Sequence, residues 1–158
     1  MSLVLRNLAF TIVVPGAGGV LLPWLVLSAS EPRSEPTVWP ALVPIAAGFG
    51  LYLGCMWLFA TIGRGTPGPW DAPRRLVMVG PYRWVRNPIY VGVLLVVLGE
   101  AWLFLSSALL GYAVIAAVGL HLFVTRYEEP TLRRSFGQPY VAYLAAVPRW
   151  LPRPPREG

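Results

Sequence analysis

Two long apolar runs, from Val38 to Ile62 and from Pro88 to Thr125, constrain the fold of this chain more than any other feature. A helix needs about twenty apolar residues to cross the hydrocarbon core of a bilayer, and the second run is long enough for two such helices. A third run, from Leu5 to Ala29, is interrupted by Pro15 and Pro23, which predicts a kinked helix. Only 13% of the residues are charged, against roughly 25% in soluble domains. The chain is therefore predicted to be an all-α, polytopic membrane protein with about four transmembrane helices.

We expect a single domain over residues 1–158, organised in four parts. Residues 1–62 would contain the first two spans, 63–87 a cytosolic loop, 88–125 a tight helical hairpin, and 126–158 a cytosolic C-terminal segment. Only Ser106-Ser107 offers a turn within the hairpin. In the C-terminal segment, Leu132 and Phe136 share one helical face and Gly137 suits a helix end, which predicts amphipathic helices.

The arginine distribution predicts the orientation in the membrane. All thirteen basic residues are Arg. Residues 63–87 carry five Arg and one Asp, residues 126–158 carry six Arg and three Glu, and residues 30–37 carry one Arg and two Glu. Basic loops stay on the cytoplasmic side, so both termini are expected in the cytoplasm, at a membrane of the bacterial inner-membrane type. Arginines that flank membrane spans also explain the pI of about 10.1, so no nucleic-acid partner is expected.

Two dense polar clusters flank the predicted hairpin. The first, at residues 80–92, reads Gly-Pro-Tyr-Arg-Trp-Val-Arg-Asn-Pro-Ile-Tyr-Val-Gly, and the second, at 126–129, reads Arg-Tyr-Glu-Glu. The first cluster is too elaborate for a plain loop, because it combines glycine, proline, aromatic and arginine residues directly against an apolar run. A hairpin brings its two ends to the same membrane face, so the two clusters are predicted to form one site.

The motifs resemble the isoprenylcysteine carboxyl methyltransferase and phospholipid methyltransferase superfamily of integral membrane enzymes. The likeness covers roughly residues 75–152 and rests on an ordered set: the first cluster, then Glu128-Glu129-x-x-Leu132, Phe136-Gly137, Tyr140, Tyr143 and Val147-Pro148. It implies a methyltransferase that uses S-adenosylmethionine, held on the cytosolic side by the hairpin and the C-terminal segment. The family often has Arg-His-Pro where this chain has Arg86-Asn87-Pro88. An Asn side chain hydrogen-bonds but does not titrate, which puts a proton-transfer role there in doubt.

The activity that this resemblance implies is methyl transfer to a lipophilic or membrane-associated acceptor at the cytosolic membrane face. The acceptor group would be a carboxylate, an amine or a thiol on a lipid or a lipophilic small molecule, and membrane lipids would be partners. Neither the acceptor nor the oligomeric state follows from the sequence, and no metal site is expected. Two alternatives are an NADPH-dependent reductase of the sterol-reductase type, which has a comparable Tyr-rich C-terminal pattern, and a non-enzymatic membrane scaffold.

The site residues follow from the chemistry of the cofactor and from the resemblance. The Arg86 guanidinium suits the cofactor carboxylate, while Glu128 and Glu129 suit its ammonium or ribose. The resemblance implies that Arg126 reaches the acceptor. The predicted catalytic residues are Arg86, Arg126 and Glu129, and the predicted cofactor-binding residues are Tyr82, Val85, Arg86, Asn87, Pro88, Tyr90, Gly92, His121, Glu128 and Glu129.

Each of these residues also has a plainer explanation. Arginines at the start of a span anchor it by reaching the interface, and aromatic residues there form an interfacial belt. The Glu128-Glu129 pair would then be solvated surface. His121 and Glu100 lie inside apolar runs, where an ionisable group marks a function, a hydrogen bond between helices or, for Glu100, a short span that ends near it.

Overall fold

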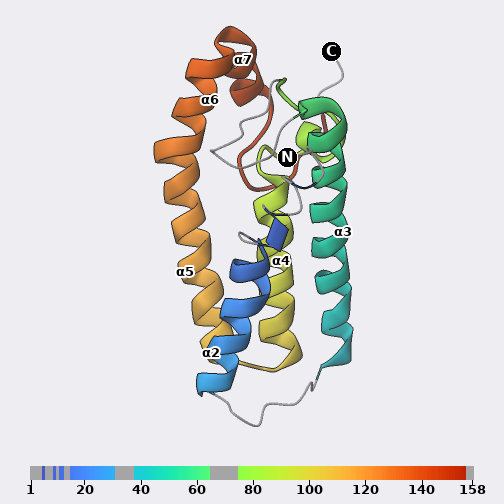
Figure 1. Ribbon diagram of the computed structural model, residues 1–158, viewed down its shortest axis with the longest axis vertical. Coiled ribbons are helices and arrows are strands. Elements are labelled where there is room, and N and C mark those ends of the chain that lie inside the picture. The colour runs from blue at the N-terminus through green and yellow to red at the C-terminus, as the bar shows by residue number, and fades with distance from the viewer. Residues whose placement is uncertain are drawn as a thin grey trace.

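The computed structural model describes residues 5, 9, 11–12, 15–30, 38–64 and 75–155. Over these ranges the chain forms helices joined by turns, with no strand, so the all-α prediction is confirmed (Figure 1). The α-helices are α2 (Leu22–Ser30), α3 (Leu42–Leu58), α4 (Pro88–Leu103), α5 (Ser107–Phe123), α6 (Glu129–Phe136) and α7 (Gln138–Ala146). Short π-helical turns occupy Ala17–Leu21, Phe59–Gly63 and Val124–Glu128, and 3-10 turns occupy Trp39–Ala41 and Gly80–Arg83.

Four apolar helices correspond to the four predicted spans. By length and composition, the continuous helices Trp39–Gly63 and Ser107–Phe136 are able to cross a membrane, while Ala17–Ser30 and Pro88–Leu103 are shorter apolar helices. The start of the first predicted span lies largely outside the described residues. The interruption expected there takes the form of the π-helical turn after Pro15. In Ser107–Phe136 the apolar part is α5, because charged residues begin at Arg126 and continue into α6.

Glycine residues allow α3 and α4 to pack closely. A Cβ atom on Gly92 would lie 2.7 Å from the carbonyl oxygen of Gly48, and a Cβ atom on Gly48 would collide with the carbonyl oxygen of Gly92. A Cβ atom on Gly99 would lie 2.5 Å from Cγ1 of Ile45. Small residues favour helix association in membranes because they let backbones approach. This contact fixes α4, and with it the polar cluster at its N-terminus.

The hairpin between α4 and α5 turns at Phe104-Leu105, slightly before the predicted Ser106-Ser107. Leu105 adopts the left-handed region with φ of 51°. The buried Ser106 caps α5 instead, since its hydroxyl accepts a hydrogen bond from the Leu109 backbone N–H at 3.2 Å. Glu100 lies in the last turn of α4, and its buried Oε2 has no hydrogen-bond partner in the part of the chain described.

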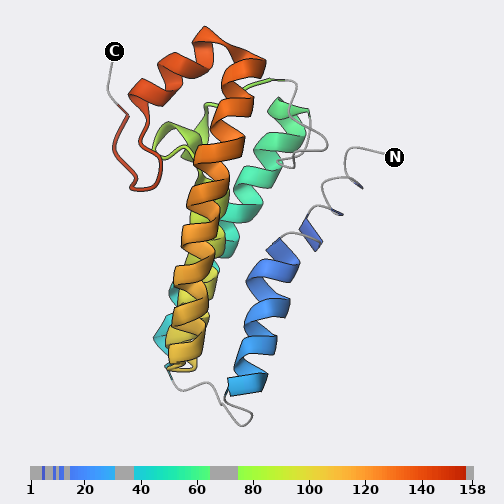
Figure 2. The ribbon, with the colours of Figure 1, turned by 90° about the vertical axis from the view of Figure 1, so that its left-hand side faces the viewer.

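The opposite end of the bundle is built by the C-terminal elements. The long helix formed by α5 and α6 ends at Gly137, whose φ of 59° suits glycine, and α7 then turns away from the long axis (Figures 1 and 2). Residues 147–155 run back to the start of α4. There the Arg86 N–H donates to the Pro148 carbonyl at 2.9 Å, and the Arg153 N–H donates to the Trp84 carbonyl at 3.0 Å. The last described part of the C-terminal segment is thus docked against the connection before α4.

The loop between α3 and α4 is partly described. Its residues 65–74, including Trp70, lie outside the described ranges. Val77 is buried in a cluster with Tyr52, Cys55, Tyr82 and Ile89. The second half of this loop is therefore packed onto α3 and α4.

Candidate functional site

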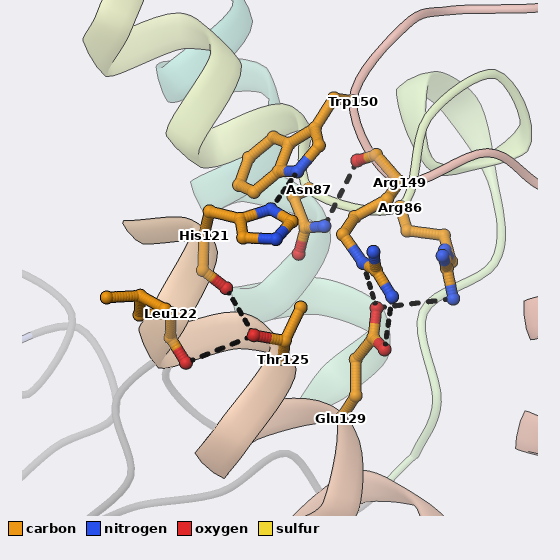
Figure 3. A network of polar contacts seen from close by, with 8 residues as sticks. All are labelled: Arg86, Asn87, His121, Leu122, Thr125, Glu129, Arg149 and Trp150. Carbon is orange, nitrogen blue, oxygen red and sulfur yellow. Dashed lines mark hydrogen bonds and ion pairs between the residues drawn. The ribbon is translucent and has the colours of Figure 1, made fainter. Parts of the chain in front are cut away.

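The candidate site lies where the connection before α4, the junction of α5 with α6, and the C-terminal segment meet (Figure 3). Pro88 is fully buried and begins α4, a position that suits proline because the first residue of a helix needs no partner for its nitrogen. Arg86 and Asn87 therefore sit just before a helix N-terminus. The fold brings the two polar clusters of the sequence into direct contact at this point.

An ion-pair network joins the clusters through Glu129. The Arg149 guanidinium binds Glu129 with two hydrogen bonds, from Nε to Oε1 at 2.8 Å and from Nη2 to Oε2 at 3.0 Å. Nη1 of Arg86 lies 3.3 Å from Oε1 of the same carboxylate. The buried Nε of Arg86 has no partner among the described residues, so this guanidinium keeps a free donor.

The two adjacent glutamates have opposite pKa shifts. Burial raises the pKa of Glu129, but the hydrogen bond from Arg149 and the charges of Arg86, Arg149 and Arg133 outweigh it, and the net pKa lies below its usual value. At Glu128, burial and the charge of Glu129 raise the pKa to about 7, despite a hydrogen bond from the Tyr90 hydroxyl at 2.8 Å. Glu129 is therefore a fixed negative charge, whereas Glu128 changes its charge near neutral pH.

Asn87 and His121 both bind the C-terminal segment. The Asn87 amide donates from Nδ2 to the Arg149 carbonyl at 3.1 Å, and the Trp150 indole N–H donates to Nδ1 of His121, also at 3.1 Å (Figure 3). Among the described residues the Asn87 side-chain oxygen has no donor, so it is left to accept a further bond. The Arg149-Trp150 dipeptide is held by side chains from both ends of the hairpin.

A family model for phospholipid methyltransferase matches residues 38–139, which is 102 of the 158 residues. The chain belongs to the phospholipid methyltransferase family. This confirms the predicted superfamily, and the family consists of methyltransferases that act at membranes. A comparison with curated protein sequences found no match. The matched region runs from α3 into α7 and contains both polar clusters, while Arg149 and Trp150 lie beyond it.

The remaining predicted site residues have different surroundings. Some are buried, one packs against a neighbouring helix, and one is exposed. Tyr82 and Val85 are buried, and the Tyr82 carbonyl accepts a hydrogen bond from the Tyr143 hydroxyl at 2.8 Å. Gly92 packs against α3, as described above, so the close helix contact alone explains a glycine at this position. Arg126 is exposed and forms no ion pair within the described ranges, so its contact with an acceptor stays a prediction.

The sequence interpretation missed Arg149 and Trp150. The Arg-Trp pair directly follows Val147-Pro148 in the chain, but the sequence analysis predicted no role for this proline-rich stretch. Arg149 and Trp150 reach the site only because residues 147–155 run back to α4 and α5. No local sequence pattern predicts that return.

Two pockets border the stretch from His121 to Glu129. One is an apolar groove of about 460 Å³ between α4 and α5, with His121 and Trp150 at its polar end. The other, of about 380 Å³, is more polar and is lined by Thr125, Glu129, Pro130, Arg133 and Arg134. The site can thus offer a polar and an apolar binding surface along one stretch of helix.

Proposed function

We propose that this protein transfers a methyl group from S-adenosylmethionine to a lipophilic or membrane-associated acceptor at the cytosolic membrane face. The observation that carries the proposal is the Arg86–Glu129–Arg149 network beside the end of an apolar groove. Family membership supports the methyl-transfer chemistry. The acceptor atom would belong to a carboxylate, an amine or a thiol.

The residues present fit the charged groups of the cofactor. S-adenosylmethionine supplies a methyl group on a cationic sulfur, so the protein mainly has to position donor and acceptor. Arg86 has an unused buried Nε donor beside the N-terminus of α4, a combination that suits the cofactor carboxylate. The carboxylate of Glu129 is already paired with the guanidinium groups of Arg86 and Arg149, so we assign the cofactor ammonium to Glu128. Glu129 then acts by orienting Arg86 and Arg149.

Other predicted residues supply contacts or surfaces. The free side-chain oxygen of Asn87 suits a ribose hydroxyl or the adenine amino group, both of which donate hydrogen bonds. Tyr90 holds Glu128 by its hydroxyl. We propose that Arg126, which is exposed on the same turn, reaches the acceptor once it is bound.

Binding assays with the purified protein in detergent test the cofactor directly. We expect calorimetry to show binding of S-adenosylmethionine and of S-adenosylhomocysteine, and none of NADPH. Binding of NADPH alone would favour the membrane reductase, and folded protein that binds none of the three would favour a scaffold. Radiolabelled S-adenosylmethionine with membrane lipid extracts should then label a lipid fraction and so identify the acceptor class.

A further inference from the structure

We propose that Arg133 and Arg134 of α6 bind the phosphate groups of anionic phospholipids at the membrane surface on the site end of the bundle. These lipids belong to the surrounding bilayer, are distinct from the methyl acceptor, and hold α6 against the membrane. The proposal concerns lipid binding alone, so it goes beyond the proposed methyl transfer and does not depend on it.

The length of the helix formed by α5 and α6 places α6 at the membrane surface. Residues Ser107–Phe136 form a continuous helix of 30 residues, which at about 1.5 Å per residue is about 45 Å long. The hydrocarbon core is about 30 Å thick, so about ten residues extend beyond it when measured from the hairpin turn. Phe123 and Tyr127, whose exposed rings stack at 5.3 Å, lie just before α6, as aromatic residues at the interface do. Arg133 and Arg134 therefore lie at the level of the lipid head groups.

The direction of α6 turns its arginine side chains back toward the membrane. The Cα–Cβ bonds of a helix tilt toward its N-terminus, and the N-terminus of α6 is the end that continues from α5. For Arg134 a hydrogen bond fixes this direction, because its Nε donates to the Pro130 carbonyl, one turn earlier, at 3.3 Å. The two terminal nitrogens of Arg134 have no partner among the described residues, so they are available to a phosphate group.

A polar pocket beside these arginines has room for a phosphate group. The pocket measures about 380 Å³ and is lined by Thr125, Glu129, Pro130, Arg133 and Arg134. The carboxylate of Glu129 is already paired with Arg86 and Arg149, so its negative charge is compensated. Arg133 and Arg134 form no ion pair within the described part of the chain. The pocket is therefore positively charged, and a guanidinium group can bind phosphate with two parallel hydrogen bonds.

The charge of this pocket determines which class of lipid it favours. Every phospholipid carries a phosphate, but a zwitterionic head group adds an ammonium that the arginines repel. An anionic head group has no such cation, and basic residues next to a membrane span attract anionic lipids. Arg126, exposed on the same helix and closer to α5, adds to this attraction.

Two pairs of arginines separate a local binding site from a general effect of net charge. The variant Arg133→Gln/Arg134→Gln removes two positive charges from the pocket. The control Arg75→Gln/Arg83→Gln removes two from the connection before α4, where both residues are exposed. Thermal unfolding in detergent shows whether each variant is folded, and Arg134→Gln alone is the milder replacement if the double variant is not.

The first experiment titrates short-chain phosphatidylglycerol, or phosphatidylcholine with the same chains, into protein in a neutral detergent and follows binding by calorimetry. We expect wild type and Arg75→Gln/Arg83→Gln to prefer phosphatidylglycerol. Each arginine near an anionic lipid contributes about fivefold, so Arg133→Gln/Arg134→Gln should bind phosphatidylglycerol about 30-fold more weakly, and Arg134→Gln about fivefold. An equal loss in both double variants, or unchanged binding in Arg133→Gln/Arg134→Gln, would overturn the proposal.

The second experiment asks whether the ligand is a lipid or a free anion. We expect inorganic phosphate at the concentration of the lipid to leave phosphatidylglycerol binding unchanged, and full competition would identify a site for a soluble anion instead. In nanodiscs of phosphatidylcholine, added phosphatidylglycerol should raise the unfolding temperature of wild type, because a ligand of the folded state stabilises it. The rise should be smaller for Arg133→Gln/Arg134→Gln, and an equal rise would contradict the assignment to these arginines.

Discussion

Glu128 and Glu129 are neighbours in the chain but have different surroundings. Glu129 lies against Arg86 and Arg149, whereas Glu128 lies against the Tyr90 hydroxyl of α4. Adjacent residues on a helix point about 100° apart, so each side chain reaches a different part of the site. The pair therefore combines one permanent charge with one that titrates.

We predict that Glu129→Gln destabilises the protein by about 1.5–3 kcal/mol, because it leaves two guanidinium groups facing each other without a carboxylate. Because the folded-state pKa is lowered, the contribution of Glu129 should be complete above its ordinary pKa of 4.5 and be lost as the pH falls below it. Thermal unfolding in detergent measures both effects. Glu128→Gln is the control, since a Gln oxygen still accepts the Tyr90 bond, and equal unfolding temperatures for the two variants would contradict the prediction.

We also predict that the affinity for S-adenosylmethionine rises as the pH increases from about 6 to about 7.5. Glu128, with a pKa of about 7, becomes ionised in this range, while most of an α-amino group with a pKa of about 7.7–8.0 is still protonated. The carboxylate would then attract the cofactor ammonium. Calorimetry at several pH values should give a rising affinity for wild type and a flat one for Glu128→Gln. A rise of equal size in that variant would remove Glu128 from the cofactor site.

At the scale of elements, the contact between α3 and α4 holds the site in place. The site residues Arg86 and Asn87 precede α4 directly, so a shift of α4 against α3 moves them relative to Glu129. Gly48 and Gly92 leave no room for a methyl group at this contact. Gly50, on another side of α3, has no atom within 4 Å of the position a Cβ would take.

We predict that Gly48→Ala costs about 1–3 kcal/mol of stability and lowers methyl transfer, because α3 and α4 have to move apart. Gly50→Ala is the matched control and should be neutral or slightly stabilising, since Ala favours a helix over Gly. Unfolding temperatures and cofactor affinity of both variants test this. Identical behaviour of the two alanine variants would show that the close helix contact does not position the site.

At the scale of the whole molecule, the site and the hairpin turn lie at opposite ends of the bundle (Figures 1 and 2). The arginine-rich segments lie at the site end, so the distribution of basic residues predicts that this end faces the cytosol. One exposed residue is available at each end of the bundle. Leu105 lies in the hairpin turn, and Ser135 lies in α6 at the site end.

We predict that a cysteine at Leu105 reacts with a membrane-impermeant maleimide in intact cells, while a cysteine at Ser135 reacts only after permeabilisation. The native Cys55 is buried and provides the background. The opposite labelling pattern would invert the proposed topology, and labelling of both positions in intact cells would show that α4 and α5 do not form a membrane hairpin.

The fold class, the helical segments and the family could be predicted from the amino-acid sequence, because apolar runs, prolines and glycines act locally on the backbone. It also indicated both polar clusters, since a hairpin necessarily brings its ends together. The pairing of the charges, in contrast, follows from the folded arrangement of the chain. Glu129 is predicted to contact the cofactor, and the structure pairs it with Arg86 and Arg149, the latter from a segment twenty residues further along the chain. Gly92 makes the close contact with Gly48, which the sequence analysis did not predict, and its place at the cofactor stays a prediction. Such pairings depend on which distant segments the folded chain places side by side, and the local sequence pattern does not contain that information.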